Sequence, residues 1–61
     1  MKRSALLKHL RGQNCEFLSE GSRHTVYVNR DAQRSSTVPR YTEISDKLAR
    51  KLCKDLGVPP P

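Results

Sequence analysis

One histidine stands out in this chain by its residue type and its place. His24 follows residues 20–23, Glu-Gly-Ser-Arg, a stretch typical of a turn, and opens the best strand pattern in the sequence. Histidine is the residue type whose ordinary pKa lies nearest to neutral pH, so it can accept and donate protons there. His24 is therefore the first candidate for acid–base chemistry, and the surface around it is the first candidate for binding.

The charge of the chain points to a polyanionic partner. Twelve Lys and Arg residues stand against six Asp and Glu residues, which gives a formal net charge of +6. The basic residues are spread over the whole length, whereas a disordered basic tail would be a contiguous block. This spread predicts a folded polyanion-binding surface, for which nucleic acid is the commonest partner. Ordinary solvated surface lysines are the alternative explanation.

The size of the chain limits what it can do. Its 61 residues allow a single domain, 1–61, because a chain this short buries only about 60% of its unfolded surface. A thin core leaves no room for a deep substrate pocket or a dinucleotide-binding domain. A few residues acting on a large substrate supplied from outside fit this size better than a metabolic enzyme does.

Membrane insertion, secretion and metal binding all lack support in the sequence. No apolar run approaches the ~20 residues that span a bilayer, and no signal-peptide core follows Lys2 and Arg3, so a cytoplasmic location is expected. Cys15 and Cys53 do not form a Cys-x-x-Cys or Cys/His ligand pattern. We expect both cysteines to be reduced core residues, with no metal site.

Hydrophobic periodicity and turn residues divide the chain into five elements. Leu6, Leu7 and Leu10 give a helix over 4–12 with Ser4 as its N-cap. Three strand-like stretches follow, over 15–19, 24–28 and 33–38, the last of them stopped by Pro39. A final helix has an apolar stripe from Ile44 to Leu56, with Thr42 or Ser45 as its cap and Gly57 at its end.

This order predicts an α+β fold of the α-β-β-β-α type. Consecutive strands with short connections form a three-stranded antiparallel sheet, and both helices are expected on one face of it. The other face would then be open to a partner. Four basic residues form one arc on the final helix, opposite its apolar stripe: Lys47, Arg50, Lys51 and Lys54. A solvated helix face is the commoner explanation for such an arc.

Four stretches of the sequence resemble the HicA family of bacterial toxins, and together they span almost the whole chain. They are Met-Lys-Arg-Ser with Leu-Leu-Lys at 1–8, Glu-Gly-Ser-Arg-His at 20–24, Val-Pro-Arg-Tyr-Thr-Glu-Ile at 38–44, and Leu-Ala-Arg-Lys-Leu-Cys-Lys-Asp-Leu-Gly at 48–57. The resemblance implies a double-stranded-RNA-binding-domain-like fold used as a ribosome-independent, mRNA-cleaving toxin. It also implies that a HicB-like antitoxin covers the active site.

The resemblance places the family's catalytic histidine at His24. Family members usually have Gly, Ser or Asn before this histidine, whereas this chain has Arg23, which leaves the shape of the loop open and could add a phosphate contact. RNA carries its own nucleophile, the 2′-hydroxyl, so cleavage needs a base, an acid and positive charge near the phosphate, but no metal or other cofactor. His24 could be the base or the acid, with Arg23, Arg34 or Arg40 stabilising the phosphorane.

Several further residues are candidates for RNA contacts, each with a simpler structural alternative. Tyr27 could stack on a base or pack at the sheet, and packing is the commoner role. Gly21 could serve the turn, and Ser22 could cap the turn or bind a phosphate. Lys47 and Lys51 could hold the RNA backbone from the final helix.

Two other classes of function stay open beside the nuclease. A non-catalytic RNA-binding module of the same fold would use shape and 2′-hydroxyl contacts without cleaving. A DNA-binding repressor is disfavoured because about thirty residues of strand-like sequence separate the two helices, which excludes a helix-turn-helix.

Overall fold

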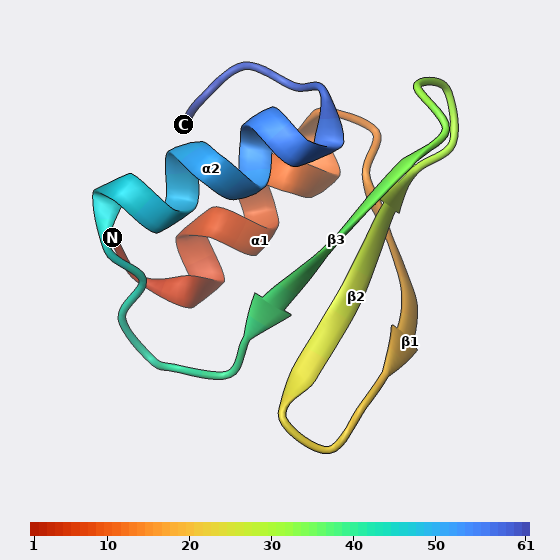
Figure 1. The fold of residues 1–61 in the computed structure, drawn as a ribbon. Coiled ribbons are helices and arrows are strands. Elements are labelled where there is room, and N and C mark those ends of the chain that lie inside the picture. The colour runs from red at the N-terminus through yellow and green to blue at the C-terminus, as the bar shows by residue number, and fades with distance from the viewer.

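The computed structural model describes all 61 residues and contains two helices and three strands (Figure 1). In chain order they are α1 (Arg3–Gly12), β1 (Glu16–Glu20), β2 (His24–Asn29), β3 (Arg34–Pro39) and α2 (Asp46–Leu56). The predicted α+β class and the α-β-β-β-α order are confirmed.

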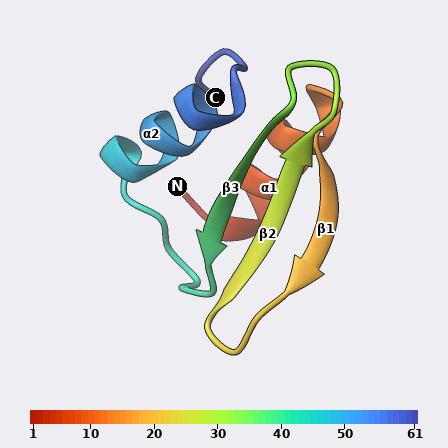
Figure 2. The ribbon, with the colours of Figure 1, turned by 45° about the vertical axis from the view of Figure 1, so that its right-hand side comes forward.

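The strands form one antiparallel sheet in the order β1-β2-β3, so β2 is central. Burial alternates along β2: Thr25, Tyr27 and Asn29 are buried, and the residues between them are more exposed. Successive side chains of a strand point to opposite faces, so the buried set faces the helices. Figure 2 shows the other face, with α1 behind the sheet and α2 beside β3. His24 lies on this open face, at the start of β2.

The start of α1 differs from the prediction. Lys2, not Ser4, is the N-cap residue, and no side chain caps the helix. The helix start is fixed instead by the segment before α2, because Lys2 forms an isolated bridge with Glu43 and the Arg3 N–H donates to the Thr42 carbonyl at 2.9 Å. This long-range contact cannot be seen in a local capping pattern.

The ends of α2 follow the sequence closely. Ser45 is its N-cap, and the Ser45 hydroxyl accepts a hydrogen bond from the Leu48 N–H at 3.2 Å, as N-cap residues typically do. Gly57 ends the helix in the left-handed conformation, with φ of 71°, which favours glycine. The prediction of Ser45 or Thr42 as cap and Gly57 as stop is therefore confirmed, with Ser45 in the role.

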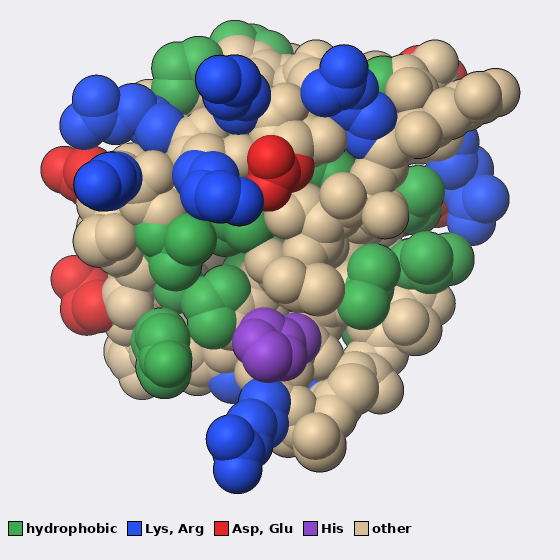
Figure 3. Space-filling view, viewed as in Figure 1, with side chains coloured by type: hydrophobic (Ala, Val, Ile, Leu, Met, Phe, Trp, Pro, Cys, Tyr) green, Lys and Arg blue, Asp and Glu red, His purple; other side chains and the backbone are tan.

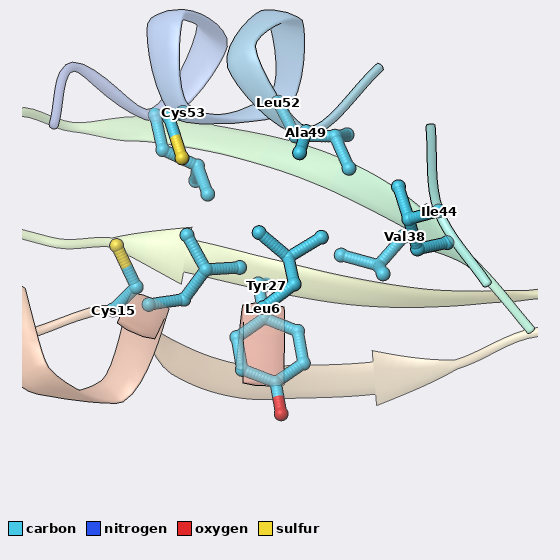
Figure 4. Packing of buried hydrophobic residues seen from close by; sticks show 10 residues of the cluster. Leu6, Cys15, Tyr27, Val38, Ile44, Ala49, Leu52 and Cys53 are labelled. Carbon is cyan, nitrogen blue, oxygen red and sulfur yellow. The ribbon is translucent and has the colours of Figure 1, made fainter. Parts of the chain in front are cut away.

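A single core lies between the helices and the sheet (Figure 4). Its largest fully buried side chains come from both helices, from β3 and from the segment before α2: Leu6, Leu10, Ile44, Leu56, Val38 and Cys53. The apolar stripe of α2 supplies four of the ten core residues, which explains why its periodicity is the clearest in the sequence. Neither helix has the length and apolar character needed to cross a bilayer.

Both cysteines are free and buried, as predicted. Figure 4 shows their sulfur atoms pointing into the core from opposite sides. The strand predicted over 15–19 is shifted by one residue, because β1 runs from Glu16 to Glu20. Cys15 lies just before this strand, and Phe17 on it is 54% exposed. Burial raises the pKa of both thiols above their usual 9.0, and for Cys53 the nearby Cys15 adds to the rise.

Replacing either cysteine by Ala should lower the free energy of unfolding by about 1–3 kcal/mol, because a buried side chain is truncated. The raised thiol pKa values also make the free energy of unfolding depend on pH. The two thiols lose their protons at a lower pH in the unfolded chain than in the folded protein. Their contribution to the free energy of unfolding is therefore complete below about pH 9 and falls as the pH rises further. Urea titrations of the wild type and of each variant from pH 7 to 10 measure both effects. Unfolding of the wild type by a reductant alone would contradict the assignment.

Candidate active site around His24

His24 stands at an exposed corner where β2 begins and β3 ends. Its backbone pairs with Pro39, the last residue of β3. The hydrogen bonds at this corner go to neighbours of His24 and leave its exposed ring free. The ring borders a shallow depression of about 530 Å³ whose other lining residues come from the two loops at this end of the sheet: Ser22, Arg23, Pro39, Arg40 and Tyr41.

The connection before His24 is closed by the backbone. The Gly21 N–H donates to the His24 carbonyl at 2.8 Å. Gly21 does not adopt a positive φ, and a Cβ there would meet only the His24 carbonyl at 3.5 Å, an ordinary contact. The turn therefore does not require glycine at this position, and Ser22 and Arg23 at its tip are exposed.

Arg40 connects the loop between β1 and β2 to the end of β3. Its Nη2 donates to the Gly21 carbonyl at 2.8 Å and lies 3.1 Å from Oε1 of Glu20. The same carboxylate oxygen accepts a hydrogen bond from the buried Thr25 hydroxyl at 3.0 Å. Arg40 and Glu20 thus join the β1–β2 connection to the segment after β3, directly beside His24.

Arg3 extends this network into the protein. Its Nη2 donates to the Thr25 hydroxyl at 2.9 Å, and its Nε donates to the Pro39 carbonyl at 2.9 Å. Thr25, the residue after His24, and Pro39, the cross-strand partner of His24, are therefore both held from α1. Local sequence patterns do not indicate this role of Arg3, because it depends on a contact between residues 22 positions apart.

The two arginines nearest His24 differ in what they can do. Arg40 is half-exposed, but its guanidinium is already engaged by Glu20 and Gly21. The ion pairs of the chain do not include Arg23, which is exposed beside His24. Arg23 is the cation free to bind a phosphate at this corner, whereas the contacts of Arg40 are those of a positioning residue.

Two of the predicted site residues lie elsewhere. Tyr27 is only 4% exposed and faces the helices, so no base can stack on it (Figure 4). Arg34 pairs with Asn29 at the far end of β2, five residues or about 17 Å from His24. The Arg34 guanidinium lies 3.5 Å from the Lys54 carbonyl, near the end of α2. Arg34 therefore cannot stabilise charge on a phosphate at His24.

Lys51 is brought toward His24, and Lys47 lies farther along α2. His24 and Lys51 line the same depression between β3 and α2, together with Asp55. Lys51 Nζ forms an ion pair with Asp55 Oδ2 at 3.0 Å. Lys47 lines the neighbouring depression on α2 with Lys51 and Lys54.

Tyr41 is a site residue that the sequence reasoning missed. It is 68% exposed and lines the His24 depression, two residues after the end of β3. Its place two residues after Pro39, which ends a strand, could have indicated a loop beside His24. The second histidine, His9, is not part of this corner, since its Nε2 lies 2.9 Å from the Pro59 carbonyl.

The structure thus defines a small α+β domain with an exposed histidine near cationic side chains at one end of its sheet. Nowhere do three His, Cys, Asp or Glu side chains lie together in a way that could hold a metal ion. Comparisons with family models, curated proteins and solved structures find no match to the chain.

Proposed function

We propose that the chain is a ribosome-independent, metal-independent endoribonuclease, the toxin of a toxin–antitoxin pair that acts on mRNA in the cytoplasm. The observation that carries this proposal is the exposed His24 ring at a corner built from stretches that resemble the HicA family. Arg23 beside it can bind a phosphate. Arg40 holds the Gly21 carbonyl in the loop before His24, and Arg3 holds the carbonyl of Pro39, its cross-strand partner.

The proposed chemistry uses the nucleophile that RNA supplies. The 2′-oxygen attacks the adjacent phosphorus as its proton leaves, the bond from phosphorus to the 5′-oxygen breaks, and the departing oxygen takes a proton. The products are a 2′,3′-cyclic phosphate and a free 5′-hydroxyl. His24 serves either as the base that takes the 2′-proton or as the acid that protonates the 5′-oxygen, and water exchanges the other proton. Arg23 stabilises the negative charge that develops on the phosphate.

The purified protein should cleave a labelled RNA near pH 7 equally well with and without EDTA, because the proposed steps involve only side chains and the RNA. The measurement is the rate of appearance of fragments that end in a 2′,3′-cyclic phosphate. Loss of cleavage in EDTA with recovery on adding Mg²⁺ would contradict the metal-independent mechanism.

A non-catalytic RNA-binding module is the second candidate function. The observation that favours it is that no side chain orients the His24 ring, whereas a catalytic histidine is usually held by a hydrogen bond. Such a module would bind the labelled RNA in the same assay and leave it intact.

A HicB-like antitoxin is the proposed protein partner, and it should cover His24 and the basic rim around it. A partner with acidic residues would associate fast by electrostatic steering with a chain of net charge +6. The association rate should therefore fall as ionic strength rises, which stopped-flow measurements at 50–500 mM salt can show. A salt-independent rate, together with RNA cleavage that persists in the purified complex, would count against this surface.

A further inference from the structure

Three shallow depressions that share lining residues follow one another past His24. The first lies between the two loops at the His24 corner, the second between β3 and α2, and the third along α2. The first and second share His24 and Pro39, and the second and third share Leu48 and Lys51. We call this surface, from Tyr41 past His24 to Lys54, the His24 groove.

The His24 groove is strongly cationic. Figure 3 shows Lys and Arg side chains over α2 and a histidine side chain lower on the same face. Among the groove's cations on α2, Lys47, Arg50 and Lys54 make no ion pair, and Lys51 is paired with Asp55. Lys47, Lys51 and Lys54 are spaced by four and three residues, so they form one stripe about 10 Å long on the helix.

An exposed aromatic ring stands at the other end of the groove. The chain has three aromatic residues: Tyr27 is in the core, Phe17 is on β1 and contacts Tyr27, and Tyr41 is the most exposed at 68%. Proteins that bind single-stranded nucleic acid combine a cationic groove with aromatic side chains on which bases stack. In the His24 groove, Tyr41 supplies the aromatic ring and the stripe of Lys47, Lys51 and Lys54 on α2 supplies the cations. The two lie on either side of His24.

We propose that the His24 groove binds RNA as a single strand, with a base stacked on Tyr41 and the backbone following the α2 stripe. This inference rests on the proposed function and names its substrate class. A base within a duplex is stacked between its neighbours and cannot place its face on Tyr41. The 2′-oxygen must also swing in line with the leaving oxygen, which the regular backbone of a paired strand opposes.

The test measures binding by the wild-type protein of a short fluorescent RNA whose 2′-oxygens are methylated, so that it cannot be cleaved. The single strand should bind at least 10-fold more tightly than the same strand in a duplex. Tyr41→Ala should weaken single-strand binding about 5- to 100-fold, the effect of losing one stacked base. Tyr41→Phe should restore the affinity, and Phe17→Ala, the matched exposed aromatic on β1, should leave it unchanged.

The cationic stripe is tested by the salt dependence of the same binding. Lys47→Gln with Lys54→Gln should flatten the plot of log affinity against log salt by about 1.4, since each phosphate contact on a single strand contributes ~0.7. The matched control, Lys8→Gln with Arg11→Gln, removes two exposed cations from α1 and should leave the slope unchanged.

Results other than these would contradict the proposed binding of a single strand in the His24 groove. Equal or tighter binding of the duplex, or variants at Tyr41 and on α2 that behave like their controls, would place the RNA elsewhere. If the wild type still cleaves RNA in that case, the proposed function survives and only the groove is wrong. If the wild type neither binds nor cleaves RNA, both fail. Binding of poly-glutamate as tight as that of RNA would show a surface for acidic proteins.

Discussion

His24→Ala should fold normally, bind RNA almost as well as the wild type, and cleave it at least about 100-fold more slowly. His24 is exposed at the start of β2 and its ring makes no contact that the fold depends on, so stability should change little. The cations of the α2 stripe remain, and in the proposed mode of binding their phosphate contacts carry the affinity and its salt dependence. Removing a general acid or base typically costs 10²–10⁴-fold in rate, which accounts for the expected loss.

The measurements are the thermal midpoint, the affinity for uncleavable RNA and the single-turnover cleavage rate, each compared with the wild type. His9→Ala is the matched control, because it removes the other histidine outside the groove and should leave the rate unchanged. Cells should also tolerate the His24 variant without an antitoxin. If folded His24→Ala protein cleaves RNA at the wild-type rate, the histidine has no catalytic role.

The elements of this fold were predictable because their signals are local. The α2 helix carries its apolar stripe, its serine cap and its terminal glycine within thirteen consecutive positions, 45–57, and all three appear in the structure. The β2 strand is marked by β-branched and aromatic residues. The start of α1 was not predictable in the same way, because the backbone of residues 42 and 43 defines it.

The site was predictable only in part, since contacts across the fold decide which side chains meet. Local spacing was enough to place Arg23 beside His24. It could not show that Tyr27 faces the helices or that Arg34 lies at the far end of the hairpin, because both depend on strand register. Tyr41 was missed for the same reason: it reaches the His24 corner through the pairing of Pro39 with His24.

Arg40→Ala should lower the cleavage rate constant about 10- to 100-fold and change RNA affinity much less. The substitution removes the hydrogen bond to the Gly21 carbonyl and the ion pair with Glu20, which together fasten the loop before His24 to the end of β3. A misplacement of a catalytic group by about 1 Å can cost 10²-fold in rate. Arg23→Ala should raise KM as well as lower kcat, because Arg23 is free to bind the phosphate both in the bound RNA and in the transition state.

The positioning role predicted for Arg40 can be tested against a matched ion pair at the other end of β1. Arg30 Nε lies 2.8 Å from Glu16 Oε1, on similarly exposed side chains, but away from His24. Arg30→Ala should therefore leave cleavage unchanged, and Arg40→Lys should recover part of the rate by restoring the charge beside Glu20. Glu20→Gln should also lower kcat, because it weakens the contact that orients Arg40. The double variant should be no worse than Arg40→Ala alone, since Glu20 acts through Arg40. Additive losses, or an Arg40→Ala protein that loses affinity and keeps its rate constant, would make Arg40 a phosphate ligand instead.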